Sequence, residues 1–122
     1  MSKPKVLVID PDIDVTTSIQ TYLAHSYTFV VVHTAKDAIA ATNRKKFQII
    51  ILELSLPAGH SGLEFLHEFK SYTDTAQVPI ILFSMQKLQE DDLKSLGVAA
   101  YLYKPKTSLL QLQVTMQKLL AV

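Results

Sequence analysis

Short apolar runs alternate with longer amphipathic segments five times along the chain. The strand-length runs are Lys5–Asp10, Thr28–His33, Phe47–Glu53, Val78–Ser84 and Ala99–Tyr103. Several of them are apolar throughout, which is typical of strands in a parallel sheet that is covered on both faces. The segments between them are long enough for the crossover helices that parallel neighbours require. The pattern therefore predicts an α/β fold of the (βα)5 type, with a doubly wound, five-stranded parallel sheet.

Residues that cap helix ends mark the predicted helix boundaries. Ser61–Glu64 is a capping box, in which the serine caps the helix and the glutamate reaches back. Thr34 starts a shorter variant of this motif, and Thr107 or Ser108 can cap the last helix. Gly97 lies where the helix before it should end. The caps therefore place helices in the gaps that the strand pattern leaves.

Two of the predicted helices carry apolar stripes at helical spacing. In the helix near Asp12–His25 the stripe is Val15, Ile19 and Leu23 or Tyr22. In the C-terminal helix it is Leu109, Leu112, Met116 and Leu119. Leu110 and Val114 lie beside that second stripe. They either pack against the fourth helix or form a surface for a partner or a dimer.

Size and charge narrow the class of protein. With 122 residues and no cysteine, the chain is expected to be one domain, residues 1–122, without disulfides or thiol chemistry. Its 12 basic and 11 acidic side chains give a net charge of +1, which argues against broad nucleic-acid binding. The longest apolar runs are strand-sized, far below the roughly 20 residues that span a bilayer, and no signal-peptide pattern opens the chain. We therefore expect a cytoplasmic protein that binds neither membrane nor nucleic acid.

Polar side chains stand at four of the predicted strand ends. They are Asp10, Glu53, Ser84 and, just after the last strand, Lys104. In a doubly wound sheet, ligands bind outside the carboxyl ends of the strands, where these side chains would meet. A polar residue at one strand end is commonly only a solvated terminus, but four together indicate a functional site.

Five fragments around these positions resemble the receiver domain of bacterial two-component response regulators. They are Val6–Asp10, Ile51–Pro57, Ser61–Glu64, Pro79–Ser84 and Gly97–Pro105, in the family's order and at its separations. The resemblance covers essentially the whole chain and implies the flavodoxin-like fold of that family. It also implies a signalling module rather than an enzyme. Family members accept a phosphoryl group on an aspartate with the help of Mg²⁺.

The resemblance assigns a role to each polar strand-end residue. Glu53 stands at the phospho-acceptor position, and Asp10 matches one acid of the metal site. Ser84 and Lys104 match the hydroxyl and the lysine that bind phosphoryl oxygens. Pro105 completes the family's lysine–proline pair, which implies a cis peptide bond before it.

Three differences from the family pattern affect the site. Pro11 replaces the second acid of the metal pair, and Asp12 is the next acid. We expect Asp12 to cap the first helix, with metal binding as the alternative. Glu53 is longer than aspartate by one methylene, which moves the carboxylate by up to roughly 1.5 Å. The loop Pro57–Gly62 is one residue longer than the common pattern. It places His60 near the rim of the site, as a pH sensor, a ligand contact or a plain exposed side chain.

These differences argue against phosphoryl transfer to Glu53. A misplacement of about 1 Å can slow a reaction on the order of 100-fold, and Mg²⁺ needs near-ideal octahedral geometry. We therefore expect negligible phosphorylation. We also expect no tightly bound cofactor, with at most weak Mg²⁺ binding by Asp10 and Glu53.

The longer carboxylate suggests a different use of the site. Glu53 reaches further toward Lys104, and a standing contact between them would partly imitate a phosphorylated aspartate. The pull on Ser84 should be weaker, because phosphorylation adds a charge of about −1.5 to −2. Tyr101 matches the family's aromatic switch, which turns inward in the active form. Two states therefore compete, a fixed active-like form and an inert form with Tyr101 outward.

Three functions follow from these observations. The leading hypothesis is a phosphorylation-independent receiver that acts as a protein-interaction module. Its partner would be a histidine kinase or a downstream effector, docked on the fourth helix, fifth strand and fifth helix, and a homodimer through that face is an alternative. The second hypothesis is a working receiver that takes a phosphoryl group from a histidine kinase, with Mg²⁺ on Asp10 and Asp12. The third, a flavodoxin-like ligand binder, lacks a glycine in the first strand–helix turn, and no Ser–His–Asp or Cys–His set points to a hydrolase.

Overall fold

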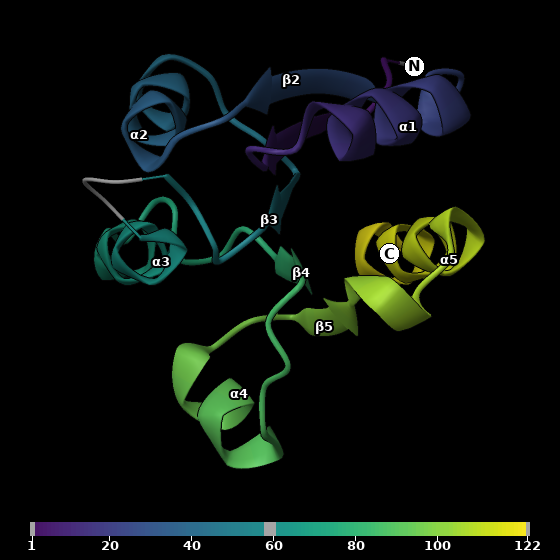
Figure 1. Cartoon of the computed structure of the whole chain (residues 1–122). Coiled ribbons are helices and arrows are strands. Elements are labelled where there is room, and N and C mark those ends of the chain that lie inside the picture. Colours follow the sequence, from purple (N-terminus) through teal and green to yellow (C-terminus); the bar gives the residue numbers. More distant parts are fainter. Residues whose placement is uncertain (1, 58–60, 122) are drawn as a thin grey trace.

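Five strands form one parallel sheet in the order β2-β1-β3-β4-β5 (Figure 1). Their bounds are β1 Lys5–Ile9, β2 Thr28–Val32, β3 Ile49–Leu52, β4 Ile80–Ser84 and β5 Ala100–Tyr103. The helices are α1 Ile13–Leu23, α2 Ala35–Arg44, α3 Gly62–Ser71, α4 Glu90–Leu96 and α5 Leu109–Leu120, and a 3₁₀ turn, Lys104–Lys106, precedes α5. This computed structural model describes residues 2–57 and 61–121. The expected (βα)5 fold with its doubly wound parallel sheet is confirmed.

The helices cover the two faces of the sheet in two groups. α1 and α5 lie on one face, where Ile19 and Met116 are fully buried against the central strands. α2, α3 and α4 lie on the other face, where Ala38 and Phe65 belong to a second core. Successive side chains of a strand point to opposite faces, so β1, β3 and β4 contribute to both cores. This double burial explains why their sequences are apolar throughout.

Side chains cap most helices where the sequence predicts caps. Asp12, Thr34, Ser61 and Ser108 each precede a helix and accept hydrogen bonds from its first-turn amides. Asp12 therefore has the structural role that we preferred over metal binding. α4 ends at Gly97, whose φ of 67° lies in the left-handed region that glycine tolerates best.

Three details differ from or refine the expectations. Strand and helix ends are shifted by up to two residues, as when β3 starts at Ile49 instead of Phe47. Of the two residues considered for the end of the α1 stripe, Leu23 is buried and Tyr22 points into solvent. The expectation of a cis peptide bond before Pro105 is wrong, because that bond is trans. Pro105 lies inside a 3₁₀ turn, where a trans proline already has the φ that the first turn of a helix needs.

Gly62 starts α3 very close to the end of β3. A Cβ atom at this position would lie 2.7 Å from the Cα of Leu54 and 2.8 Å from the carbonyl oxygen of Glu53. The absence of a side chain therefore lets α3 begin directly against the loop that carries Glu53.

In the described part of the chain, no helix is both long and apolar enough to cross a membrane.

Candidate functional site

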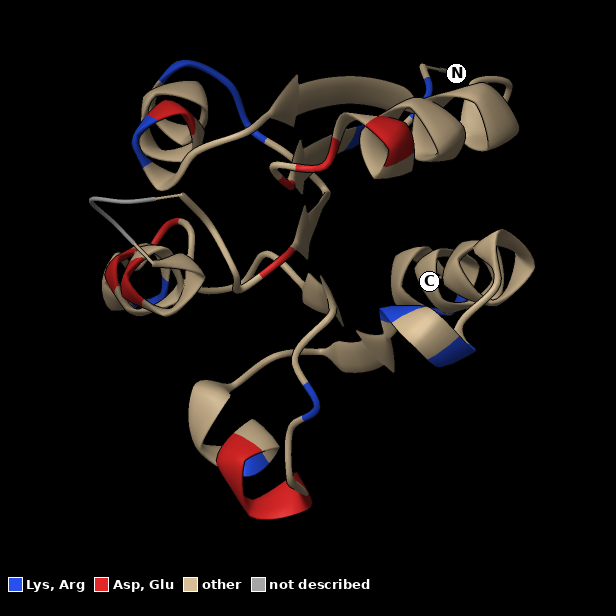
Figure 2. Cartoon of the chain, in the orientation of Figure 1, with Lys and Arg blue, Asp and Glu red and all other residues tan. Residues whose placement is uncertain are grey.

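Four polar side chains converge at the carboxyl edge of the sheet. Asp10 follows β1, Glu53 follows β3, Ser84 ends β4 and Lys104 follows β5. Figure 2 shows the acidic positions after β1 and β3 and the basic position after β5 at this edge. The four side chains are buried, with exposed fractions of 2% for Asp10, 3% for Glu53, 0% for Ser84 and 8% for the Lys104 side chain. The structure therefore brings together the residues that the strand pattern singled out.

The carboxylate of Glu53 is held by four hydrogen-bond donors. Oε1 accepts from the amide of Met85 and from Nζ of Lys104, each at 2.9 Å. Oε2 accepts from the amide of Ser55 at 3.0 Å and from the hydroxyl of Ser84. A buried carboxylate costs free energy unless such donors compensate its lost hydration. Here each oxygen has one backbone and one side-chain partner.

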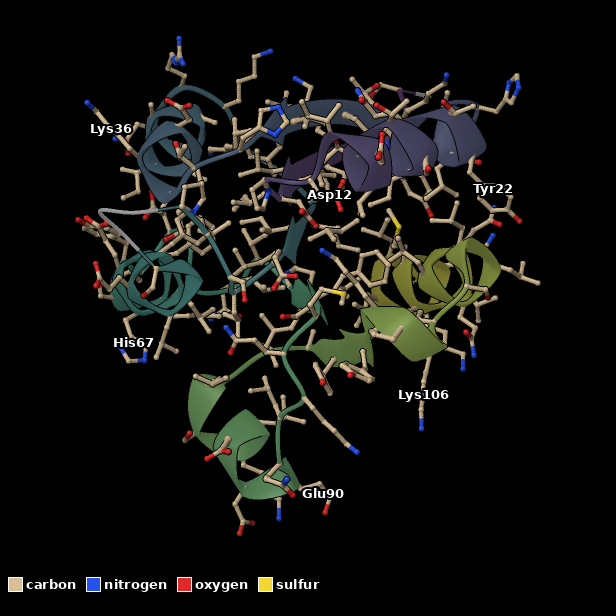
Figure 3. The ribbon with its side chains drawn as sticks, in the orientation of Figure 1. Asp12, Tyr22, Lys36, His67, Glu90 and Lys106 are labelled. Carbon is tan, nitrogen blue, oxygen red and sulfur yellow. The ribbon has the colours of Figure 1, made fainter. Side chains whose placement is uncertain are left out.

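Lys104 joins the two buried acids. Its Nζ lies 2.5 Å from Oδ2 of Asp10 and 2.9 Å from Oε1 of Glu53. The ammonium group also lies 5.7 Å from the centre of the Phe83 ring, within the range of a cation–π contact. Lys106, two positions later, points away from the molecule (Figure 3). The cluster of Asp10, Glu53 and Lys104 therefore has a net charge of −1 when all three groups are ionised.

Burial affects the two acids alike, yet their pKa values move in opposite directions. Burial alone would raise the pKa of Glu53, but its four donors outweigh that effect and hold the pKa below its ordinary value. Burial raises the pKa of Asp10, because the hydrogen bonds from Lys104 and from the amide of Asp12 compensate only in part. The negative charge of the site is therefore held most firmly on Glu53.

A chain of hydrogen bonds leads from the site to Tyr101. The oxygen of Ser84 accepts from the amide of Gln86 at 3.1 Å. The carbonyl oxygen of Gln86 accepts from the hydroxyl of Tyr101 at 2.6 Å, and that hydroxyl accepts from the amide of Leu88 at 3.2 Å. Tyr101 is partly buried and packs against the core under α2, α3 and α4. The tyrosine is thus bonded inward, and three hydrogen bonds through Ser84 and Gln86 connect its hydroxyl to the carboxylate of Glu53.

The residues near Asp10 fit a divalent cation poorly. Pro11 offers no ligand atom, and Oδ1 of Asp12 accepts from the amides of Asp14 and Val15 at the start of α1, where Figure 3 places this residue. The two oxygens of Asp10 accept from Lys104 and from the amide of Asp12. Among the described residues, no group of three or more acidic, histidine or cysteine side chains could hold a metal ion. His60 lies outside the described residues, so its expected place at the rim stays a prediction.

Sequence reasoning missed three contributors to the site. Ser55 and Met85 take part through backbone amides, and the residue type does not predict such a contact. Gln86 takes part through its amide, its carbonyl and its side chain. The available signal was position, because Ser55 and Gln86 each come two residues after a site residue at a strand end.

Comparisons with known proteins identify the family of this chain. Residues 6–115 match the family model described as the response regulator receiver domain. The probable transcriptional regulator ycf29 of Cyanophora paradoxa is 32% identical over 103 residues, 82% of this chain and 49% of that protein. The chain thus spans about half the length of this curated relative.

Solved structures share the fold over almost the whole chain. The chemotaxis response regulator CheY4 of Vibrio cholerae has a TM-score of 0.87 at 23% identity, over 98% of this chain and 100% of that one. The receiver domain of the sensor histidine kinase PA1611 from Pseudomonas aeruginosa has a TM-score of 0.86 at 22% identity, over 99% and 100%. That domain holds a magnesium ion in its active site cleft. At such identities the structures show the fold alone.

Proposed function

The chain belongs to the family of response regulator receiver domains, and on that basis we propose that it is a phosphorylation-independent receiver. In this proposal residues 1–122 form a protein-interaction module of two-component signalling and not an enzyme. Glu53 replaces the phospho-acceptor aspartate and holds the site in a fixed, active-like form. Ser84 and Lys104 bind the Glu53 carboxylate as they would bind a phosphoryl group. Tyr101 takes the inward position that would accompany such binding.

The four donors on the Glu53 carboxylate carry this proposal. A phosphoryl group on an aspartate would present oxygens to the lysine, the hydroxyl and nearby amides, and the longer glutamate presents its own oxygens to such donors. The imitation is partial, because a carboxylate has about one charge and phosphorylation adds about −1.5 to −2 with three acceptor oxygens. The inward hydrogen bond of Tyr101 favours the active-like form over the inert one.

The same contacts argue against a working phospho-acceptor. An attacking carboxylate oxygen needs access and a productive position, yet both oxygens of Glu53 are occupied and the side chain is 3% exposed. Phosphoryl transfer depends mainly on positioning and charge stabilisation. The acids available to Mg²⁺ already have other partners, since Asp10 is bonded to Lys104 and Asp12 caps α1. We therefore propose weak Mg²⁺ binding at most, through Asp10 and Glu53.

The partner is proposed to dock on the face formed by α4, β5 and α5. Tyr101 lies in β5, so its position affects this face directly. Leu110 and Val114 on α5 are 57% and 39% exposed, so the described residues cover this apolar pair only in part. A histidine kinase or a downstream effector would supply that cover, and a second copy of the chain is the alternative.

Incubation with acetyl phosphate and Mg²⁺, followed by intact mass measurement, tests the proposal. We expect no stable gain of a phosphoryl group on the native protein. The double variant Pro11→Asp with Glu53→Asp restores the second metal acid and the acceptor aspartate, and it is the positive control, expected to gain one phosphoryl group. A stable phosphoryl group mapped to Glu53 would refute the proposal and favour a working Mg²⁺-dependent receiver that uses Asp10 and Asp12.

A further inference from the structure

Two loops flank the carboxylate of Glu53, and each donates a backbone amide to it. Ser55 belongs to the loop after β3, and Met85 belongs to the loop after β4. One side-chain contact joins these loops directly, since Nε2 of Gln86 donates to Oγ of Ser55 at 2.9 Å. None of the roles proposed above uses this contact.

The contact closes a ring of hydrogen bonds. Oε2 of Glu53 accepts from the amide of Ser55 and from the hydroxyl of Ser84. The oxygen of Ser84 accepts from the amide of Gln86, whose side chain returns to Ser55. Two strand ends are thereby tied together, and this ring is complete only through the side chain of Gln86.

Gln86 is also the residue to which the inward tyrosine is bonded. Its carbonyl oxygen accepts from the hydroxyl of Tyr101 at 2.6 Å. The path of the backbone at Gln86 therefore decides where that hydroxyl finds an acceptor. A loop that drifts away from Ser55 would carry the acceptor with it and release the tyrosine.

We propose that Gln86 is a positioning residue that latches the β4–α4 loop to the β3–α3 loop and so keeps Tyr101 on its inward hydrogen bond. This proposal rests on the proposed function, in which Glu53 sets a fixed active-like site. A neutral amide suits the position, because Nε2 has hydrogens to donate and adds no charge beside Asp10 and Glu53. The latch is one solvent-exposed hydrogen bond, so its effect is modest and local.

Amide hydrogen exchange of Leu88, followed by NMR, measures the latch. The N–H of Leu88 donates to the hydroxyl of Tyr101, so its exchange reports whether the tyrosine is in place. Gln86→Ala and Ser55→Ala should each speed this exchange by roughly two- to tenfold, the range expected for one hydrogen bond. The double variant should be no faster than either single variant, because both remove the same contact.

Two controls separate positioning from general loss of structure. Gln89→Ala changes another exposed glutamine of the same loop, which makes no side-chain cap contact to α4, and should leave the Leu88 rate unchanged. The amide of Leu52 in β3 should keep its native exchange rate in every variant, because the sheet itself is not opened. A purely structural role for Gln86 would speed both amides together and would overturn the proposal.

The variant Glu53→Gln distinguishes the latch from the proposed function. If Glu53→Gln speeds exchange at Leu88 and Gln86→Ala does not, the latch is wrong and the fixed active-like site stands. If Gln86→Ala speeds exchange at Leu88 and Glu53→Gln leaves it unchanged, the latch stands and the fixed active-like site is wrong. Additive effects of Gln86→Ala and Ser55→Ala would also overturn the latch, since they would then act through different contacts.

Discussion

Glu53 and Asp10 share one ammonium group but differ in how well their charges are compensated. Glu53 adds two backbone amides and a serine hydroxyl to its contact with Lys104. Asp10 adds one backbone amide, so burial dominates its pKa. Lowering the pH should therefore change the contributions of the two residues to the free energy of unfolding in opposite directions.

The pH dependence of stability follows from the lowered pKa of Glu53. The folded state binds this proton less tightly than the unfolded chain, so the stabilisation is present above the ordinary value of 4.5 and is lost as the pH falls below it. The free energy of unfolding should decline with acid more steeply in the native protein than in Glu53→Gln, as measured by urea unfolding between about pH 3 and pH 7. The raised pKa of Asp10 acts in the opposite direction, with stability lost as the pH rises above 3.8. Parallel curves for the two proteins would contradict the assignment.

Replacing Lys104 by methionine should strongly destabilise the fold. The change leaves two buried carboxylates without their cation, which costs about 3–5 kcal/mol when a buried pair is broken. Lys106→Met, in the same 3₁₀ turn but exposed, is the matched control and should stay within about 0.5 kcal/mol of the native value. Urea unfolding at neutral pH measures both. Equal effects of the two variants would show that the cluster contributes little.

At the scale of single elements, the start of α3 constrains the position of the loop that carries Glu53. A Cβ atom at Gly62 would meet backbone atoms of Leu54 and Glu53, which cannot move aside as a flexible side chain would. Gly62→Ala should cost about 1–3 kcal/mol through overpacking, as measured by urea unfolding. The comparison is Gly97, where nothing lies within 4 Å and the difficulty is a positive φ. Asparagine tolerates that φ, so Gly97→Asn should be milder than Gly97→Ala, whereas Gly62→Asn should be no milder than Gly62→Ala.

The elements differ in how far the sequence predicts them. Continuous apolar runs and caps such as Ser108 are local signals, so the order and type of elements could be predicted. The positions of Asp10, Glu53 and Ser84 at one edge of the sheet could be predicted for the same reason, because each follows or ends an apolar run. The contact of Gln86 with Ser55 depends instead on the path of two loops, and residue types alone do not encode such a path.

At the scale of the whole molecule, sheet order joins distant parts of the sequence. β1 lies between β2 and β3, and β5 lies beside β4, so the strand ends after β1, β3, β4 and β5 line one edge. Lys104 and Asp10 are 94 positions apart in sequence, yet they form an ion pair. The site therefore exists only when β1, β3, β4 and β5 are assembled in the sheet.

The distribution of charge on α4 and α5 affects self-association. α4 carries the acidic residues Glu90, Asp91 and Asp92, whereas α5 carries only Lys118 as a charged residue (Figure 2). Cross-pairs of charges between copies would therefore be few, and an apolar contact through Leu110 and Val114 is the better match.

Light scattering after size-exclusion chromatography tests this contact at several concentrations. If a second copy covers this face, the mean mass should rise above 13.6 kDa with concentration and change little with salt, because the contact is apolar. The double variant Leu110→Lys with Val114→Lys should remain monomeric with nearly unchanged stability, since both side chains are exposed. A monomeric mass at every concentration of the native protein would remove the dimer and leave the face to another partner.

The four donors around Glu53 have a consequence for how long a signal lasts. A phosphoryl group on aspartate is added after synthesis and removed by hydrolysis, whereas the glutamate carboxylate is built in at translation. No phosphatase can erase it. The amount of active-like protein would then equal the amount of folded chain, so transcription and proteolysis would set the strength of the signal and its lifetime.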